Sequence, residues 1–131
     1  LMIIKINSSN KNEFIEITSL IKNSILENKW RNGIIFLNVL HTTAALTINE
    51  NADNDVKTDL INALNELVPD IRYYHNEGNS DSHLKASLIG SDLMVQIENG
   101  NPILGKWQGI YFCEFDGPRI NRQIKISFVE K

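Results

Sequence analysis

The sequence of 131 residues has little of several features that would mark special protein classes. Its single cysteine cannot form a disulfide within the chain, which agrees with a reducing compartment. Its densest apolar run, within residues 34–40, is far shorter than the roughly 20 residues that span a bilayer. The N-terminal residues lack the pattern of a signal peptide. We therefore expect a cytoplasmic protein with no membrane partner.

The chain also lacks an excess of positive charge. Its formal net charge is -3, so no general basic field would attract a nucleic-acid backbone. It contains no glycine-rich phosphate-binding motif and no GxSxG nucleophile motif, which disfavours a nucleotide-binding fold and a serine nucleophile. Cys113 lies between Phe112 and Phe115, a pattern that favours a buried strand position over a reactive thiol.

The pattern of apolar residues predicts a single α+β domain covering residues 1–131, without repeats or linkers. Strand-like segments at both ends surround two or three helices, so the simplest architecture is a sandwich or a partial barrel. Helical spacing and alternation predict the following elements: strands at 2–7, 33–41 and around 47–48, helices at 17–29, after Asp53 and from Asp81 or Ser82 to Gly90, and a meander of strands near 93–97, 110–115 and 124–128.

The three histidines are the first candidates for chemistry. His41 falls at a strand end, His75 in a polar loop and His83 in the first turn of a helix. Three imidazoles with an open fourth position form a known catalytic zinc site, and imidazole also binds other divalent metals. Their separations of 34 and 8 residues are not diagnostic, because only the fold can bring them together. Three unrelated histidines that bond backbone groups remain the alternative.

Acidic and amide side chains are concentrated around the histidines. They are Asn49, Glu50, Asp53 and Asp55 before the central helix, and Glu77, Asn79 and Asp81 in the later loop. A carboxylate near a metal can accept a proton or orient a ligand histidine. Asp53 and Asp81 can equally be helix N-caps.

The last third supplies turns and cations. Residues 99–102 (NGNP) are typical of a hairpin turn, and the glycines of 105–109 (GKWQG) indicate close backbone approach. Lys106, Arg119 and Arg122 can offer positive charge to a phosphate or carboxylate group, although exposed arginines are usually only solvated.

Several blocks of the chain resemble one family. They are 41–51 (HTTAALTINEN), 74–79 (YHNEGN), 83–87 (HLKAS), 104–108 (LGKWQ), 113–115 (CEF) and 116–119 (DGPR). In this order and at these distances they resemble the YjbQ-like family, also called the secondary thiamine-phosphate synthase family. The resemblance spans almost the whole chain and is weakest over residues 8–32.

The resemblance implies a fold and a site. It implies two mostly antiparallel sheets with helices, assembled as a homotrimer, and a metal site in which His41, His75 and His83 bind zinc, or else magnesium. The implied activity is a weak thiamine-phosphate synthase reaction, which joins hydroxymethylpyrimidine diphosphate to a thiazole phosphate. Such a protein would bind small phosphorylated metabolites.

The roles that we assign within this site follow the same resemblance. Glu50 or Glu77 would transfer protons, and the substrate contacts would be Asn49, Asp53, Asn79, Lys106 and Arg119. Two other functions stay open. One is a metal-dependent hydrolase of a small phosphorylated or amide substrate, and the other is a trimeric protein that binds a metal or metabolite without catalysis.

Overall fold

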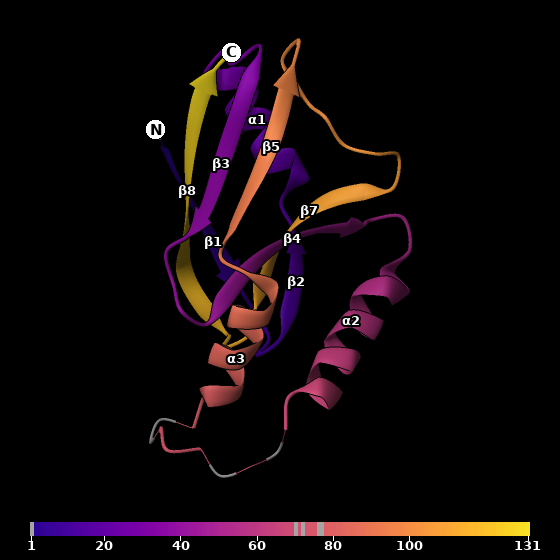
Figure 1. The fold of residues 1–131 in the computed structure, drawn as a ribbon, viewed down its shortest axis with the longest axis vertical. Coiled ribbons are helices and arrows are strands. Elements are labelled where there is room, and N and C mark those ends of the chain that lie inside the picture. The colour runs from indigo at the N-terminus through magenta and orange to yellow at the C-terminus, as the bar shows by residue number, and fades with distance from the viewer. Residues whose placement is uncertain (1, 70, 72, 76–77) are drawn as a thin grey trace.

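Two antiparallel sheets form the framework of the computed structural model, which describes residues 2–69, 71, 73–75 and 78–131. The larger sheet has the strand order β1 (Met2–Ser8), β8 (Arg119–Glu130), β3 (Gly33–Val39), β5 (Asp92–Glu98) and β6 (Asn101–Pro102). The smaller sheet has the order β2 (Glu13–Glu16), β7 (Gln108–Glu114) and β4 (Ala44–Glu50). Figure 1 shows the two sheets crossing, with both termini at one end of the larger sheet.

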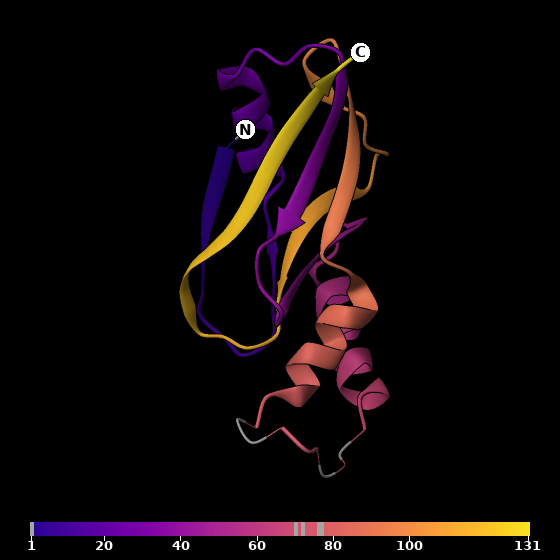
Figure 2. The same ribbon diagram turned by 60° about the vertical axis from the view of Figure 1, so that its left-hand side comes forward.

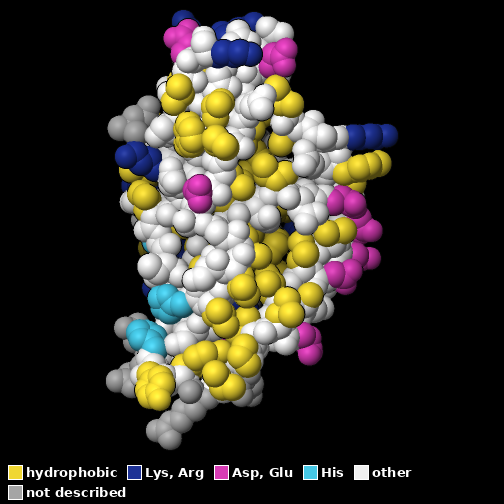
Figure 3. Space-filling view, in the orientation of Figure 1, with side chains coloured by type: hydrophobic (Ala, Val, Ile, Leu, Met, Phe, Trp, Pro, Cys, Tyr) yellow, Lys and Arg dark blue, Asp and Glu magenta, His cyan; other side chains and the backbone are white. Residues whose placement is uncertain are grey.

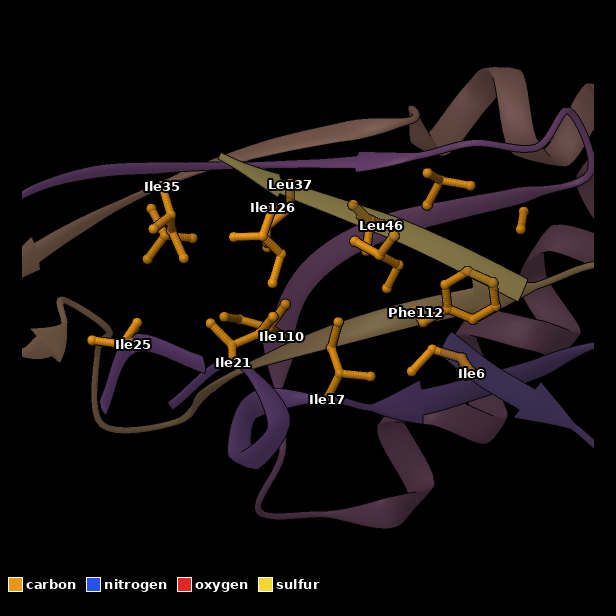
Figure 4. Close-up of a cluster of buried hydrophobic side chains, with 14 of the residues drawn as sticks. Ile6, Ile17, Ile21, Ile25, Ile35, Leu37, Leu46, Ile110, Phe112 and Ile126 are labelled. Atoms are coloured by element: carbon orange, nitrogen blue, oxygen red, sulfur yellow. The ribbon is translucent and has the colours of Figure 1, made fainter. Parts of the chain in front are cut away.

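The main core lies between the two sheets and is closed by α1 (Thr18–Glu27). Alternate residues of β3 and β8 point inward, toward the α1 side chains and toward β7, as Figure 4 shows. The fully buried members of this core include Ile21, Ile25, Ile35, Leu37, Ile110, Phe112, Ile124 and Ile126. The alternating pattern of the sequence therefore corresponds to one inward face on each sheet.

The smaller sheet is buried on both faces. The residues of β7 that point away from the main core pack against Leu64 of α2 (Asn54–Leu67) and Ala86 of α3 (Ser80–Ile89). Figures 1 and 2 both show these two helices side by side at the foot of the molecule. Cys113 belongs to this second cluster, and its burial raises the pKa of the thiol. The predicted buried position of Cys113 is confirmed.

The predicted α+β fold of two mostly antiparallel sheets with helices is confirmed. The predicted meander of the last strands is wrong. β7 follows β5 and precedes β8 in sequence, but it lies in the smaller sheet, whereas β5 and β8 lie in the larger one. Short local patterns identify strands but carry no information about their partners. The sequence analysis also missed β2, which has four residues.

The N-termini of α2 and α3 test the predicted N-caps, Asp53 and Asp81. Asp53 is the N-cap of α2, and its Oδ1 accepts the Asp55 N–H at 2.9 Å. Asp81 is not a cap, because α3 begins one residue earlier with Asn79 as its N-cap. The Asp81 carboxylate instead binds Lys11 Nζ at 2.8 Å.

Two predictions about glycine are confirmed. Asn99 and Gly100 have φ values of 52° and 80° in the tight turn between β5 and β6. A Cβ on Gly109 would lie 2.7 Å from Glu16 Oε2 and 2.9 Å from the Asn51 Cβ, so the side chains of Glu16 and Asn51 pack closely against this backbone. None of the described helices is long and apolar enough to cross a membrane.

Candidate histidine site

The three histidines lie on one side of the molecule. His41, just before β4, and His83, on α3, line the same pocket of about 540 Å³. The ring of His75 meets the ring of His83 edge to face, with 5.4 Å between centroids. Figure 3 shows two histidine side chains next to each other near the foot of the domain. The fold thus gathers residues that the sequence separates.

His41 is held by a hydrogen bond from the backbone. Its Nε2 accepts the Gln123 N–H of β8 at 2.8 Å. Burial lowers the pKa of His41, and the Arg122 guanidinium lowers it further. Both observations favour a neutral imidazole whose proton is on Nδ1.

The donor chemistry of these side chains fits a divalent ion, but the described geometry is not a formed metal centre. Among the described residues, no group of three or more His, Cys, Asp or Glu side chains is positioned to hold a metal ion. His75 and His83 are within contact of each other. His41 could join them only by exchanging its bond from Gln123 for a bond to the metal, since a neutral imidazole has one free nitrogen lone pair.

A buried ion pair lies behind His41. Glu114 is fully buried and Arg122 is 6% exposed. Two bonds join them, from Arg122 Nε to Oε2 at 2.9 Å and from Nη2 to Oε1 at 2.5 Å. The Ser8 hydroxyl also donates to Oε2 at 2.8 Å, and Arg122 donates to Thr43 Oγ1 at 2.8 Å. This network ties β1, β7 and β8 to the segment that carries His41.

The environment of Glu114 keeps its carboxylate charged. Burial alone would raise the pKa of this group. The hydrogen bonds from Arg122, from the Asp116 N–H and from Ser8 outweigh burial and hold the pKa below its ordinary value.

Two predicted substrate contacts, Asn79 and Arg119, meet at Asp116. Asn79 Nδ2 donates to Asp116 Oδ2 at 3.0 Å, and Arg119 Nη2 donates to the same oxygen at 2.9 Å. The Oδ1 atom of Asn79 is buried and has no hydrogen-bond partner among the described residues. Asp116 therefore holds the half-exposed Arg119 side chain, while no described residue uses the Oδ1 acceptor of Asn79.

The other predicted residues lie elsewhere. Asn49 and Glu50 are at the far end of β4, and Glu50 is six residues, or about 20 Å of strand, from Ala44 at the histidine end. Asp53 caps α2, and Lys106 Nζ stacks over the Trp107 ring at 4.8 Å. Within one chain these four residues do not join the histidines. Glu77 lies outside the described residues.

Lys85 is a candidate that the sequence analysis did not single out. It is only 3% exposed, and its Nζ donates to Asn65 Oδ1 at 2.6 Å and to Asn12 Oδ1 at 3.2 Å. Burial lowers the pKa of Lys85, although the charge of Asp81 partly opposes this effect. The residue falls in a matched block, 83–87, but a helical lysine is usually solvated. Only the fold shows that this one is buried.

Lys85 lines a second pocket, of about 450 Å³. His75 also lines this pocket, whereas His83 lines the first one. The His75 and His83 rings are in contact, so one histidine from the lining of each pocket touches the other. The remaining lining of the second pocket includes Lys11, Asn65, Tyr73, Ser80 and Asp81.

Comparisons with known proteins identify the family. The family model described as UPF0047 protein YjbQ-like matches residues 2–131. UPF0047 protein MJ1081 of Methanocaldococcus jannaschii is 49% identical over 116 residues, which cover 88% of this chain and 84% of the relative. UPF0047 protein YugU of Bacillus subtilis is 44% identical over 118 residues, covering 88% and 89%.

Solved structures agree with this result. A crystal structure of an uncharacterized conserved YjbQ/UPF0047 protein from Clostridium acetobutylicum matches with a TM-score of 0.93 and 45% identity, covering 98% of this chain and all (100%) of that one. A YbjQ-like protein of unknown function from Sulfolobus solfataricus also gives a TM-score of 0.93, at 27% identity, with coverage of 99% and 96%. This chain belongs to the YjbQ-like UPF0047 family.

Proposed function

We propose that this protein is a thiamine-phosphate synthase-like transferase that joins two small phosphorylated molecules at the histidine site. The observation that supports the proposal is a pair of pockets, of about 540 and 450 Å³, whose linings each contribute one of the two contacting histidines, His83 and His75. Each has the volume of a small-molecule site. A reaction between two substrates needs two adjoining sites, whereas hydrolysis needs only one organic substrate.

The proposed reaction is a substitution at carbon. The thiazole nitrogen forms a bond to the pyrimidine methylene carbon while the bond from that carbon to the diphosphate oxygen breaks, and pyrophosphate leaves with the electron pair. The main electrostatic demand is therefore the growing negative charge on the leaving group. Lys11 and Lys85 in the second pocket supply positive charge at that point.

A divalent ion, when bound, would polarise a phosphate oxygen as a Lewis acid. His41, His75 and His83 would hold it, and a set of imidazoles favours zinc over magnesium, which prefers oxygen ligands. The buried ion pair of Glu114 and Arg122 fixes the strands behind His41. The positions of Asn79 and Arg119 at Asp116 supply an amide and a guanidinium beside the same end of the sheets.

We further propose that the protein acts as a homotrimer in which one subunit's far end completes a neighbour's histidine site. The distance of about 20 Å along β4 supports this, because Asn49, Glu50, Asp53 and Lys106 could reach the histidines only from another copy. Mixing His83→Ala protein with Glu50→Gln protein, with exchange of subunits, would then restore activity that each lacks. Activity that stays absent in the mixture would contradict a shared site.

A protein that binds a metal or metabolite without catalysis is the second candidate. It is favoured by the location of Glu50, the proposed proton-transfer group, at the end of β4 away from His41. In that case the protein would bind its ligand without turning it over, and Glu50→Gln would bind the ligand as wild type does.

The direct test is synthesis from both precursors. Zinc-loaded protein is incubated with hydroxymethylpyrimidine diphosphate and thiazole phosphate, and thiamine phosphate and pyrophosphate are quantified. The proposal predicts both products in equal amounts, with loss in His83→Ala and no loss in Lys22→Ala on the exposed face of α1. Release of phosphate from one substrate alone would instead indicate a hydrolase, and no turnover would leave the binding protein.

A further inference from the structure

Among the described residues, no carboxylate is hydrogen-bonded to the buried ammonium group of Lys85. Both acceptors of its ammonium group, Asn65 Oδ1 and Asn12 Oδ1, belong to neutral amides. An ammonium group has three N–H donors, and the bonds to described residues use two of them. Burial of a cation is costly unless a counter-charge compensates it.

The neighbouring carboxylate is already engaged. Asp81 binds Lys11 Nζ at 2.8 Å, and all three residues line the pocket of about 450 Å³. Among the described lining residues the permanently charged side chains are two lysines and one aspartate, so this part of the lining has one more positive than negative charge. An anion that enters this pocket would meet the positive charge of Lys85 together with that of the half-exposed Lys11.

The N-terminus of α3 opens on the same pocket. Ser80 and Asp81, in its first turn, line the cavity. The N-cap residue, Asn79, makes no side-chain capping bond, although the Asp81 carboxylate interacts with the Ser82 N–H. Backbone N–H groups and the helix dipole at such an end favour a bound anion, and the Ser80 hydroxyl can donate a further hydrogen bond.

We propose that this pocket is a binding subsite for a phosphoryl group, held by Lys85 and Lys11. This inference rests on the proposed function for the nature of the ligand, which would be the diphosphate of the substrate and later the pyrophosphate product. His75 lines the same pocket, so a diphosphate bound there would lie next to the histidine pair. The subsite itself requires no metal.

The sharpest variant is Asn65→Asp. It replaces the amide oxygen 2.6 Å from Lys85 Nζ with a carboxylate oxygen of the same shape, so it cancels the free charge and keeps the packing. Asn23→Asp, on the exposed face of α1, adds the same charge elsewhere and is the matched control. Lys85→Met removes the charge outright, with Lys22→Met as its control.

Binding of inorganic phosphate and pyrophosphate is measured by calorimetry on full-length protein freed of metal with a chelator. We expect wild type, Asn23→Asp and Lys22→Met to bind pyrophosphate equally. Asn65→Asp and Lys85→Met should bind about tenfold or more weakly, since each removes a charge-assisted contact. Thermal unfolding of each variant checks that it is folded, and Asn65→Asp decides the result if Lys85→Met is not.

Wild-type protein that binds neither phosphate nor pyrophosphate would overturn the subsite. So would an Asn65→Asp protein that binds as tightly as wild type, because Lys85 would then be only a structural link between Asn12 and Asn65. Acetate that binds as well as phosphate would overturn the phosphoryl assignment. His83→Ala should retain pyrophosphate binding, because His83 does not line this pocket. Wild-type protein that binds pyrophosphate but makes no thiamine phosphate would refute the proposed function and leave this inference standing.

Discussion

The two ends of β4 differ in what holds their polar side chains. At the histidine end, near Ala44, the buried ion pair of Glu114 and Arg122 is hydrogen-bonded to three further groups, which are the Ser8 hydroxyl, the Thr43 hydroxyl and the Asp116 N–H. At the far end the polar side chains make local bonds, since Asn49 Oδ1 accepts the Glu50 N–H and Asp53 caps the helix that follows. A buried charge needs a complete set of partners, while an exposed one does not. Of the two ends of β4, the histidine end is thus the one that holds a buried ion pair with further hydrogen-bond partners.

The largest expected effect is on stability at the histidine end. Glu114→Gln leaves the Arg122 charge buried without its partner, which should lower the free energy of unfolding by about 3–5 kcal/mol. Glu50→Gln at the far end should change it by less than about 0.5 kcal/mol. Urea unfolding followed by circular dichroism measures both. Similar losses in the two variants would abolish the distinction between the ends.

The next effect is on the metal. His83→Ala removes a proposed ligand, so its affinity for zinc should fall by about a hundredfold. After dialysis against limiting zinc it should therefore contain less zinc than wild type. Asp53→Asn, at the far end, should bind zinc normally in an isolated subunit. Elemental analysis with a competing chelator gives the affinities. Unchanged affinity in His83→Ala would remove this residue from the site.

A third prediction concerns acid. The pKa of Glu114 is lowered in the folded protein, so its ionisation stabilises the fold above the unfolded pKa, near 4.5. This stability is lost as the pH falls from that value through the folded pKa. Wild-type protein should therefore lose stability below about pH 4.5 more steeply than Glu114→Gln does. Equal slopes in urea unfolding between pH 5 and pH 3 would contradict the assigned ionisation.

The smallest effect belongs to the helix cap. Asp53→Ala removes the acceptor of the Asp55 N–H and should cost about 1 kcal/mol of stability. Asp53→Ser, which can cap the same helix, should recover most of it. Thermal unfolding of the two variants measures the difference, and an equal loss in both would show that Asp53 does more than cap α2.

Sequence patterns predicted most elements because each is encoded locally. The alternation in β3 and β8 and the helical spacing of α1 and α2 reflect which face meets the core. The Asn99-Gly100 turn was predictable for the same reason, since its positive φ values favour these two residues. Strand partners were not predictable, because the pairing of β7 with β2 and β4 joins residues far apart in sequence.

The site was predictable only in part. The blocks around His41, His75 and His83 pointed to one region, and the fold brings these residues to one side of the molecule. Glu50 was grouped with them because it is near His41 in sequence, but an extended strand carries it away. The burial of Lys85 depends on α2 and on the segment before β2, which no local pattern reveals.

One measurement tests the central claim most directly. Crystals soaked with zinc and pyrophosphate are measured at the zinc absorption edge to locate the ion. The account predicts an anomalous peak about 2.0–2.1 Å from nitrogens of His41, His75 and His83, with His41 no longer bonded to the Gln123 N–H. A peak at the far end of β4 without histidine contacts, or no peak after soaking at a saturating zinc concentration, would contradict it.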